Sequence, residues 1–207
     1  MRKSKKQIVM AAAACAMMGV MAIGGTMAYL TDSETATNTF TVGKEAITLD
    51  ETKVNSNGLP PIGPEQRVSA NAYHLLPGQS YQKNPTVHVD KDSETCYVFV
   101  KVENGIAALE AASTEARPNI AAQIASNGWI ALDGVPNVYY KEYTKNAVAT
   151  EDTDLLVFSM FTIADNADTL DAWSSVNTNT KVTVTAYAIQ EEGFANNVLA
   201  AWAEVSK

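Results

Sequence analysis

Zinc chemistry in a protein requires histidine, cysteine or carboxylate side chains at fixed spacings, and this 207-residue chain has only two histidines, His74 and His88. The sequence contains no H-E-x-x-H pair, which would place two zinc ligands on one helical face with a glutamate between them. The two histidines flank a turn, so a two-histidine zinc site remains an alternative. His88 alternates with valines, however, and this pattern favours a strand residue that faces solvent or a neighbour.

Acidic residues at alternate positions, Asp90, Asp92 and Glu94, resemble the start of a calcium loop. The later glycine and the bidentate glutamate of such a loop are missing, so the pattern predicts a solvated turn between strands. The acidic run at 151–154 is interpreted in the same way. The sequence also has no G-x-S-x-G motif and no glycine-rich phosphate loop. We therefore predict no catalytic residue, no cofactor and no metal.

The first 28 residues have the three parts of a secretory signal peptide. Four basic residues precede an uncharged apolar run from Ile8 to Ile23, and small residues follow. The run is shorter than the roughly 20 residues that span a bilayer, which favours cleavage over a retained anchor. Thr26 and Ala28 occupy the two positions that a signal peptidase reads, so we expect cleavage after Ala28 and a mature chain that begins at Tyr29. A lipoprotein site at Cys15 is the less favoured alternative.

Removal of residues 1–28 takes away four of the 15 basic residues and none of the 23 acidic ones, which changes the formal net charge from −8 to −12. Such an acidic surface repels nucleic acid, and we expect no nucleic-acid partner. One cysteine, Cys96, remains after cleavage, so the fold depends on a hydrophobic core. An apolar strand surrounds Cys96, which predicts a small buried residue and not a nucleophile.

Strand patterns dominate the rest of the chain. The run CYVFVKVEN predicts a strand covered on both faces for most of its length, and the run DLLVFSMFTI predicts another apolar strand. Residues 29–43 predict an N-terminal strand. Thr37, Thr39 and Thr41 alternate with Asn38, Phe40 and Val42, and Gly43 ends the run. Residues 44–207 predict a β-sandwich domain with a helical insert at about 106–126, split by a proline, and an amphipathic C-terminal helix. This arrangement favours an antiparallel sandwich over a βαβ fold. The apolar stripe of the C-terminal helix comprises Phe194, Val198, Leu199 and Trp202.

The segment GGTMAYLTDSETATNTFTVGKEAITLDE resembles the N-terminal signature of the TasA/camelysin (CalY) family of secreted Gram-positive proteins. Two later segments, LLPGQSYQKNPTVHV and VTVTAYAIQ, resemble family strands in the correct order. The resemblance implies a jelly-roll-like β-sandwich that a SipW-type signal peptidase releases and that polymerises into biofilm matrix fibres. It also implies that the N-terminal strand completes a sheet in a neighbouring copy. The assembly residues on this interpretation are Leu30, Thr37, Thr39, Phe40 and Val42.

Three functions follow from the sequence and the resemblance. The first is a secreted structural protein of the matrix or cell surface, whose partners are other copies and an accessory matrix protein. The second is a surface adhesin or binding module. The third is a metalloendopeptidase, because the name camelysin carries that activity, although the sequence departs from the zinc peptidase patterns. Pairing of the N-terminal strand within its own subunit stays open as the alternative to strand exchange.

Overall fold

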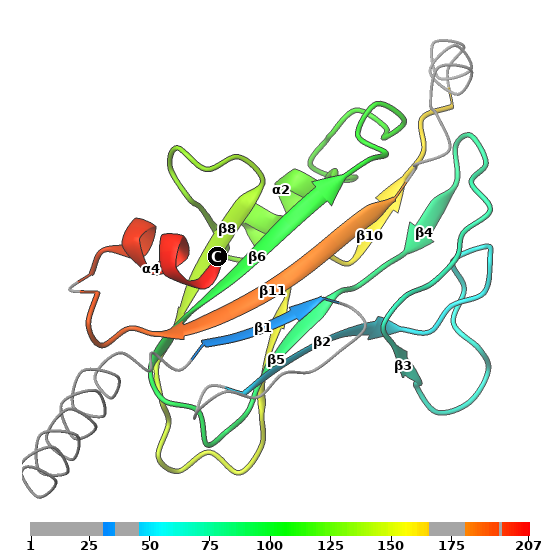
Figure 1. The fold of residues 1–207 in the computed structure, drawn as a ribbon. Coiled ribbons are helices and arrows are strands. Elements are labelled where there is room, and N and C mark those ends of the chain that lie inside the picture. The colour runs from blue at the N-terminus through cyan, green and yellow to red at the C-terminus, as the bar shows by residue number, and fades with distance from the viewer. Residues whose placement is uncertain (1–30, 36–45, 166–180, 195) are drawn as a thin grey trace, which may run out of the picture.

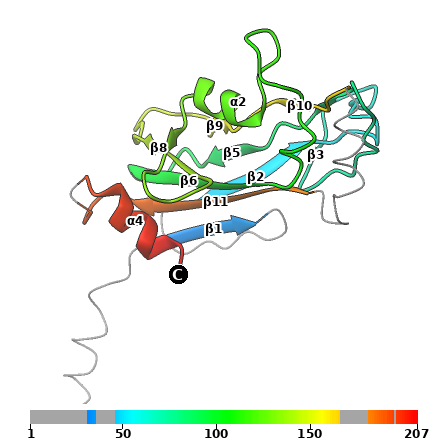
Figure 2. The same ribbon diagram turned by 90° about the horizontal axis from the view of Figure 1, so that it is seen from above.

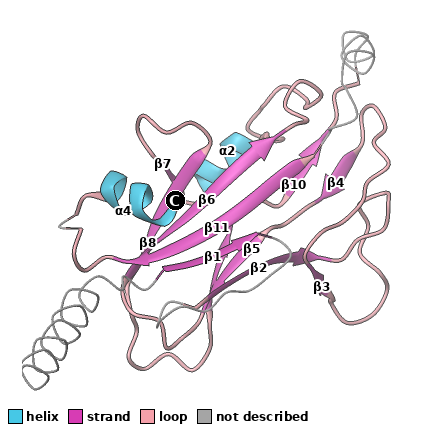
Figure 3. Cartoon of the chain, viewed as in Figure 1, coloured by secondary structure: helices cyan, strands magenta, loops and turns pink. Residues whose placement is uncertain are grey.

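A computed structural model describes residues 31–35, 46–165, 181–194 and 196–207. The described chain is mainly β with antiparallel pairing, as predicted (Figures 1 and 3). The expected signal peptide, and all of the expected N-terminal strand except residues 31–35, lie outside the described residues. The strands are β1 (Thr31–Thr35), β2 (Ile47–Thr52), β3 (Arg67–Val68), β4 (Ser80–Gln82), β5 (Thr86–Val89), β6 (Cys96–Asn104), β7 (Ile130–Ala131), β8 (Val138–Tyr143), β9 (Thr153–Leu156), β10 (Met160–Thr162) and β11 (Val182–Gln190), and the helices are α2 (Ile120–Ser126) and α4 (Val198–Val205).

Two antiparallel sheets form the body of the molecule. The larger has the order β1-β11-β6-β8-β7, and the smaller has the order β3-β2-β5-β9. Strands β10 and β4 make a separate pair. Figure 2 shows β9 and β5 above β6 and β11, with α2 at the top of the view and α4 and β1 at the bottom. The structure thus has the antiparallel sandwich that the strand patterns predict.

The core between the two sheets follows from the period-two pattern of the strands. Alternate valines of β6 and alternate residues of β11 face the apolar residues of β2 and β5 in one cluster. Burying each such side chain stabilises the fold by about 1.5–3 kcal/mol. Cys96 belongs to this cluster and is fully buried, as predicted. The residues that meet here include Val98, Val100, Val184, Ala186, Ile47, Leu49, Val87 and Val89.

The opposite face of the larger sheet is also covered, because α4 packs on it. The ring of Trp202 lies 5.4 Å from that of Phe99 and 5.2 Å from that of Tyr187. Strand β6 is therefore buried on both faces over most of its length, as its nearly continuous apolar sequence predicts. The predicted docking stripe is wrong at Leu199, which is 52% exposed. Ala201 and Val205 supply the buried positions of the helix instead.

The helical insert expected at about 106–126 is helical only in its second part. Asn119 caps α2 by accepting a hydrogen bond from the Ala122 amide (2.9 Å), and Gly128 beyond the helix has a φ of +78°. Residues 105–109 form turns instead. The backbone of Leu109 accepts a hydrogen bond from the Ala164 amide (2.9 Å), and this long-range pairing replaces a helical bond.

A second correction concerns the run DLLVFSMFTI, which the sequence predicts as one strand. The structure divides it into β9 and β10, which belong to different sheets. The side chain of Gln123 explains the break, because its Oε1 accepts hydrogen bonds from the amides of Ser159 (3.0 Å) and Met160 (3.2 Å). Phe158, which lies between β9 and β10 in the sequence, is fully buried.

Within the described residues, no helix has the length and apolar character needed to cross a bilayer.

Candidate assembly site

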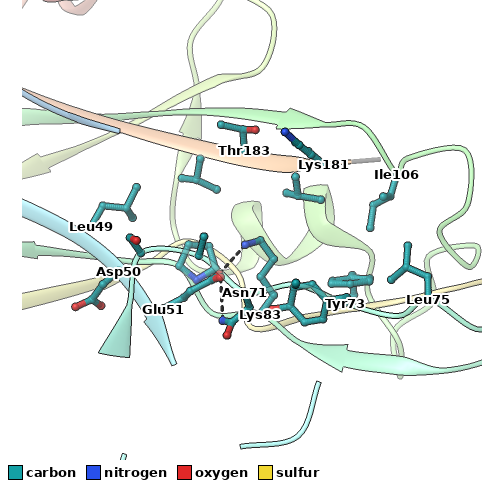
Figure 4. Close-up of a pocket in the computed structure, with 17 residues that line it drawn as sticks. Leu49, Asp50, Glu51, Asn71, Tyr73, Leu75, Lys83, Ile106, Lys181 and Thr183 are labelled. Carbon is teal, nitrogen blue, oxygen red and sulfur yellow. Dashed lines mark hydrogen bonds and ion pairs between the residues drawn. The ribbon is translucent and has the colours of Figure 1, made fainter. Parts of the chain in front are cut away.

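A groove of about 490 Å³ lies between the two sheets, next to the first residues of β11 (Figure 4). Residues 49–51 of β2 line one side, and residues 181–184 line the other. The loop at 69–75 and two apolar side chains from elsewhere, Ile106 and Phe161, complete the wall. This volume is typical of a ligand pocket, and it would also hold the side chains of an added strand.

The polar part of the groove is a buried ion pair. Lys83 Nζ lies 2.6 Å from Glu51 Oε2, and the two side chains are 12% and 3% exposed. Asn71 donates a second hydrogen bond to the same carboxylate, from Nδ2 to Oε1 (2.9 Å), and it also donates to the Thr52 carbonyl (2.8 Å). Both oxygens of this buried carboxylate therefore have a partner, as a buried polar group requires.

Aromatic rings build the apolar wall. Tyr73 packs edge-on against Phe161, with ring centroids 5.4 Å apart, and Phe161 stacks on Tyr81 at 5.2 Å. The Tyr73 hydroxyl donates a hydrogen bond to the Gln82 carbonyl (2.9 Å). Burial, and next the negative charge of Glu51, raise the pKa of Tyr73, so its hydroxyl remains a neutral donor. The aromatic rings of this wall are therefore uncharged.

In the described part of the chain, the two neighbours of β11 pair with it over different lengths. Strand β6 pairs with all nine residues of β11 from one side. From the other side β1 pairs with five of them, in a register that runs from Thr31 opposite Ile189 to Thr35 opposite Thr185. Among the described residues, no strand pairs with 182–184 on the β1 side. The same stretch lines the groove.

The residues that the sequence assigns to processing and assembly lie outside the described residues. Thr26, Ala28 and Tyr29 at the expected cleavage site precede β1 directly. The expected assembly residues are Leu30, on the N-terminal side of β1, and Thr37, Thr39, Phe40 and Val42, on its C-terminal side. The structure places only the strand between them, and these assignments stay predictions.

The two histidines occupy different settings. His88 lies on β5, as predicted, and its ring nitrogens contact two carboxylates: Nδ1 lies 2.6 Å from Asp154 Oδ1, and Nε2 lies 2.9 Å from Asp50 Oδ1. His74 is exposed in a loop, where its carbonyl accepts a hydrogen bond from the Tyr81 hydroxyl (2.8 Å). In the part of the chain that the structure describes, no three histidine, cysteine or carboxylate side chains are grouped to hold a metal ion.

The acidic segment at 90–94 forms the predicted turn between β5 and β6. The amide of Ser93 donates to the Asp90 carbonyl (2.9 Å), and the amide of Asp92 donates to the Asp90 side chain (2.8 Å). Glu94 pairs with Lys145 at 2.8 Å. The carboxylates of this segment therefore serve the turn and a surface ion pair.

Sequence reasoning missed the buried Glu51–Lys83 pair and the contacts of His88. The two partners of the buried pair are 32 positions apart, and His88 and Asp154 are 66 apart. One signal was available: Asp50 and His88 each alternate with buried apolar residues, which places both on the outer face of their strands. The sequence does not show, however, that β2, β5 and β9 are neighbours.

The fold and the groove together define a mainly β protein built from antiparallel sheets, with a groove beside the first residues of β11. A protein-family model described as "Camelysin metallo-endopeptidase" matches residues 3–63. This match confirms the predicted resemblance to the camelysin family over residues 3–63, which are less than half of the chain. Of the groove, the match includes only residues 49–51. No curated protein and no solved structure matches the chain.

Proposed function

We propose that this chain is a secreted structural protein that polymerises by exchange of its N-terminal strand. The observation that carries the proposal is the position of β1 at the edge of the larger sheet, where, among the described strands, it pairs with β11 alone. Because an antiparallel pair is held by main-chain hydrogen bonds, β1 of a neighbouring copy can occupy the same edge in the same register. Exchange would then link two subunits through the same pairing of β1 with β11, and no additional interface would be needed.

The groove supports this proposal, since it lies where a longer strand would continue. An incoming strand that keeps the β1 register would place Ala36, Thr37 and Asn38 opposite Val184, Thr183 and Val182. Phe40 would follow beyond the end of β11. Strand addition of this kind takes affinity from the backbone and specificity from side-chain pockets.

The remaining parts of the proposal come from the family and from the N-terminal sequence. We expect export, cleavage after Ala28 by a SipW-type signal peptidase, and a location in the extracellular matrix of a biofilm or on the cell surface. We also expect a jelly-roll-like strand order. Other copies are the expected partners, together with an accessory matrix protein.

Electron microscopy of the protein that begins at Tyr29, beside a version that lacks residues 29–42, tests the proposal. We expect regular filaments from the first and none from the second. Circular dichroism should report the same β content for both, which separates loss of assembly from loss of folding. Filaments from both versions, or from neither, would overturn strand exchange.

The description of the matching family gives a second candidate, a secreted metalloendopeptidase. Such an enzyme would lose activity on chelation and in His74→Ala or His88→Ala variants. The groove gives a third, an adhesin or binding module, because its size suits a small ligand. A binding module would keep its ligand without residues 29–42 and would not form filaments.

A further inference from the structure

His88 lies at the centre of the outer face of the smaller sheet. Its neighbours on β5, Val87 and Val89, are fully buried in the core, so the imidazole is on the opposite side of the sheet. Strand β5 pairs with β2 on one side and with β9 on the other. Each of these strands directs one carboxylate to the imidazole, Asp50 from β2 and Asp154 from β9.

The row of charges continues to the edge of the sheet. Arg67 on β3 binds Asp50 Oδ1 through Nε (2.7 Å) and Nη2 (2.6 Å). Its Nη1 lies 3.0 Å from Glu65 Oε1, which also accepts a hydrogen bond from the Thr52 hydroxyl (2.6 Å). We name this row, Glu65–Arg67–Asp50–His88–Asp154, the charge ladder. Its charges alternate in sign only when His88 is protonated.

The chemistry of imidazole makes the ladder sensitive to one proton. A neutral ring has one N–H donor and one lone pair, whereas the protonated ring has two N–H donors. Both ring nitrogens of His88 face carboxylate oxygens, which only accept hydrogen bonds. A neutral ring would therefore turn a lone pair toward one carboxylate, and that contact would be repulsive. Both contacts can be hydrogen bonds to carboxylates only when the ring has two N–H donors.

We propose that the charge ladder is a proton-operated clamp, in which protonated His88 holds β2 and β9 to β5 and loss of the proton releases one of the two contacts. The proposal concerns the single chain and does not depend on polymerisation. Asp50 also lines the groove, so the clamp reaches the side of the groove formed by β2.

The direction of the pH effect follows from the groups around the ring. Partial burial lowers the pKa of His88, but the hydrogen bonds and charges of Asp50 and Asp154 outweigh burial and raise the pKa above the ordinary value of 6.5. A raised pKa in the folded state contributes stability that is fully present below 6.5 and is lost as the pH rises through the folded value. Glu65 has a lowered pKa, because Thr52 and Arg67 stabilise its anion, so its effect falls on the acidic side.

The test is a ¹⁵N NMR titration of the two imidazole rings between about pH 6 and about pH 9, combined with urea denaturation over the same range. We expect a midpoint for His88 above 6.5, and a lower midpoint in the Asp154→Asn variant. The urea midpoint of the unsubstituted protein should fall as His88 titrates. His88→Gln should lose this fall, and the matched control His74→Gln should keep it.

A His88 midpoint at or below 6.5, or one that Asp154→Asn leaves unchanged, would overturn the proposal. An equal pH dependence of the urea midpoint in His88→Gln and in the unsubstituted protein would also overturn it. If His88→Gln does not fold, the titration of the unsubstituted protein and of Asp154→Asn decides the question alone.

Discussion

Strands β6 and β1 both pair with β11, from opposite sides, and they do so in different ways. Strand β6 pairs along all nine residues and has the sequence CYVFVKVEN, with its first five residues buried. Strand β1 pairs along five residues and has the sequence TDSET, which contains no apolar residue. Apolar burial makes the first pairing permanent, whereas the second offers mainly backbone hydrogen bonds. A strand such as β1, which is held mainly by backbone hydrogen bonds, can be replaced by the same strand of another copy.

The largest effect on stability should come from a substitution in β6, the strand whose pairing with β11 is buried. Phe99→Ala removes a fully buried ring that packs against Trp202, and we expect a loss of about 3–5 kcal/mol in the free energy of unfolding. Urea denaturation measures it. Leu199→Ala on the exposed side of α4 is the matched control, with an expected change below about 0.5 kcal/mol. Similar losses in the two variants would contradict the account of the core.

A comparable loss should follow from breaking the buried ion pair of the groove. Glu51→Ala leaves the Lys83 charge buried without its partner, which costs about 3–5 kcal/mol. The double variant Glu51→Gln, Lys83→Met removes both charges and should recover much of this loss. Urea denaturation of the unsubstituted protein, Glu51→Ala and the double variant measures the three free energies of unfolding. If the double variant is no more stable than Glu51→Ala, the loss has another cause.

Removal of β1 should change the stability of the fold far less. Each backbone hydrogen bond contributes about 0.5–1.5 kcal/mol, and ordering each residue of a strand costs about 1–2 kcal/mol. These contributions nearly cancel in a short polar strand. Deletion of residues 29–42 should therefore leave the urea midpoint almost unchanged while it abolishes assembly. A large drop in the urea midpoint would show that β1 is part of the permanent fold.

The smallest expected effect is that of acid on the rate of assembly. Acidification reduces the formal charge of −12 expected for the chain without residues 1–28, and copies should then repel each other less. Light scattering should rise faster in mildly acidic buffer than in neutral buffer. An equal rate of assembly in both buffers would show that net charge does not govern the rate.

Local patterns predicted most of the strands, because alternation and apolar runs report which face of a strand is buried. The continuous apolar run at 96–102 indicated a strand covered on both faces, and the structure confirms it. The division of DLLVFSMFTI was not predictable, since it depends on the side chain of Gln123, 36 positions away from Ser159. The groove and the charge ladder were missed for the same reason. They form where strands that are distant in the sequence become neighbours.

The most direct test of strand exchange is a disulfide between copies. Thr35 and Thr185 are opposite each other in the pairing of β1 with β11. A mixture of Thr35→Cys chains and Thr185→Cys chains, oxidised while it assembles, should give dimers linked by a disulfide on a non-reducing gel. Thr183→Cys, two positions out of register, should give far fewer. If the mixture gives no dimer and the double variant closes within one chain, β1 belongs to its own subunit and strand exchange is wrong.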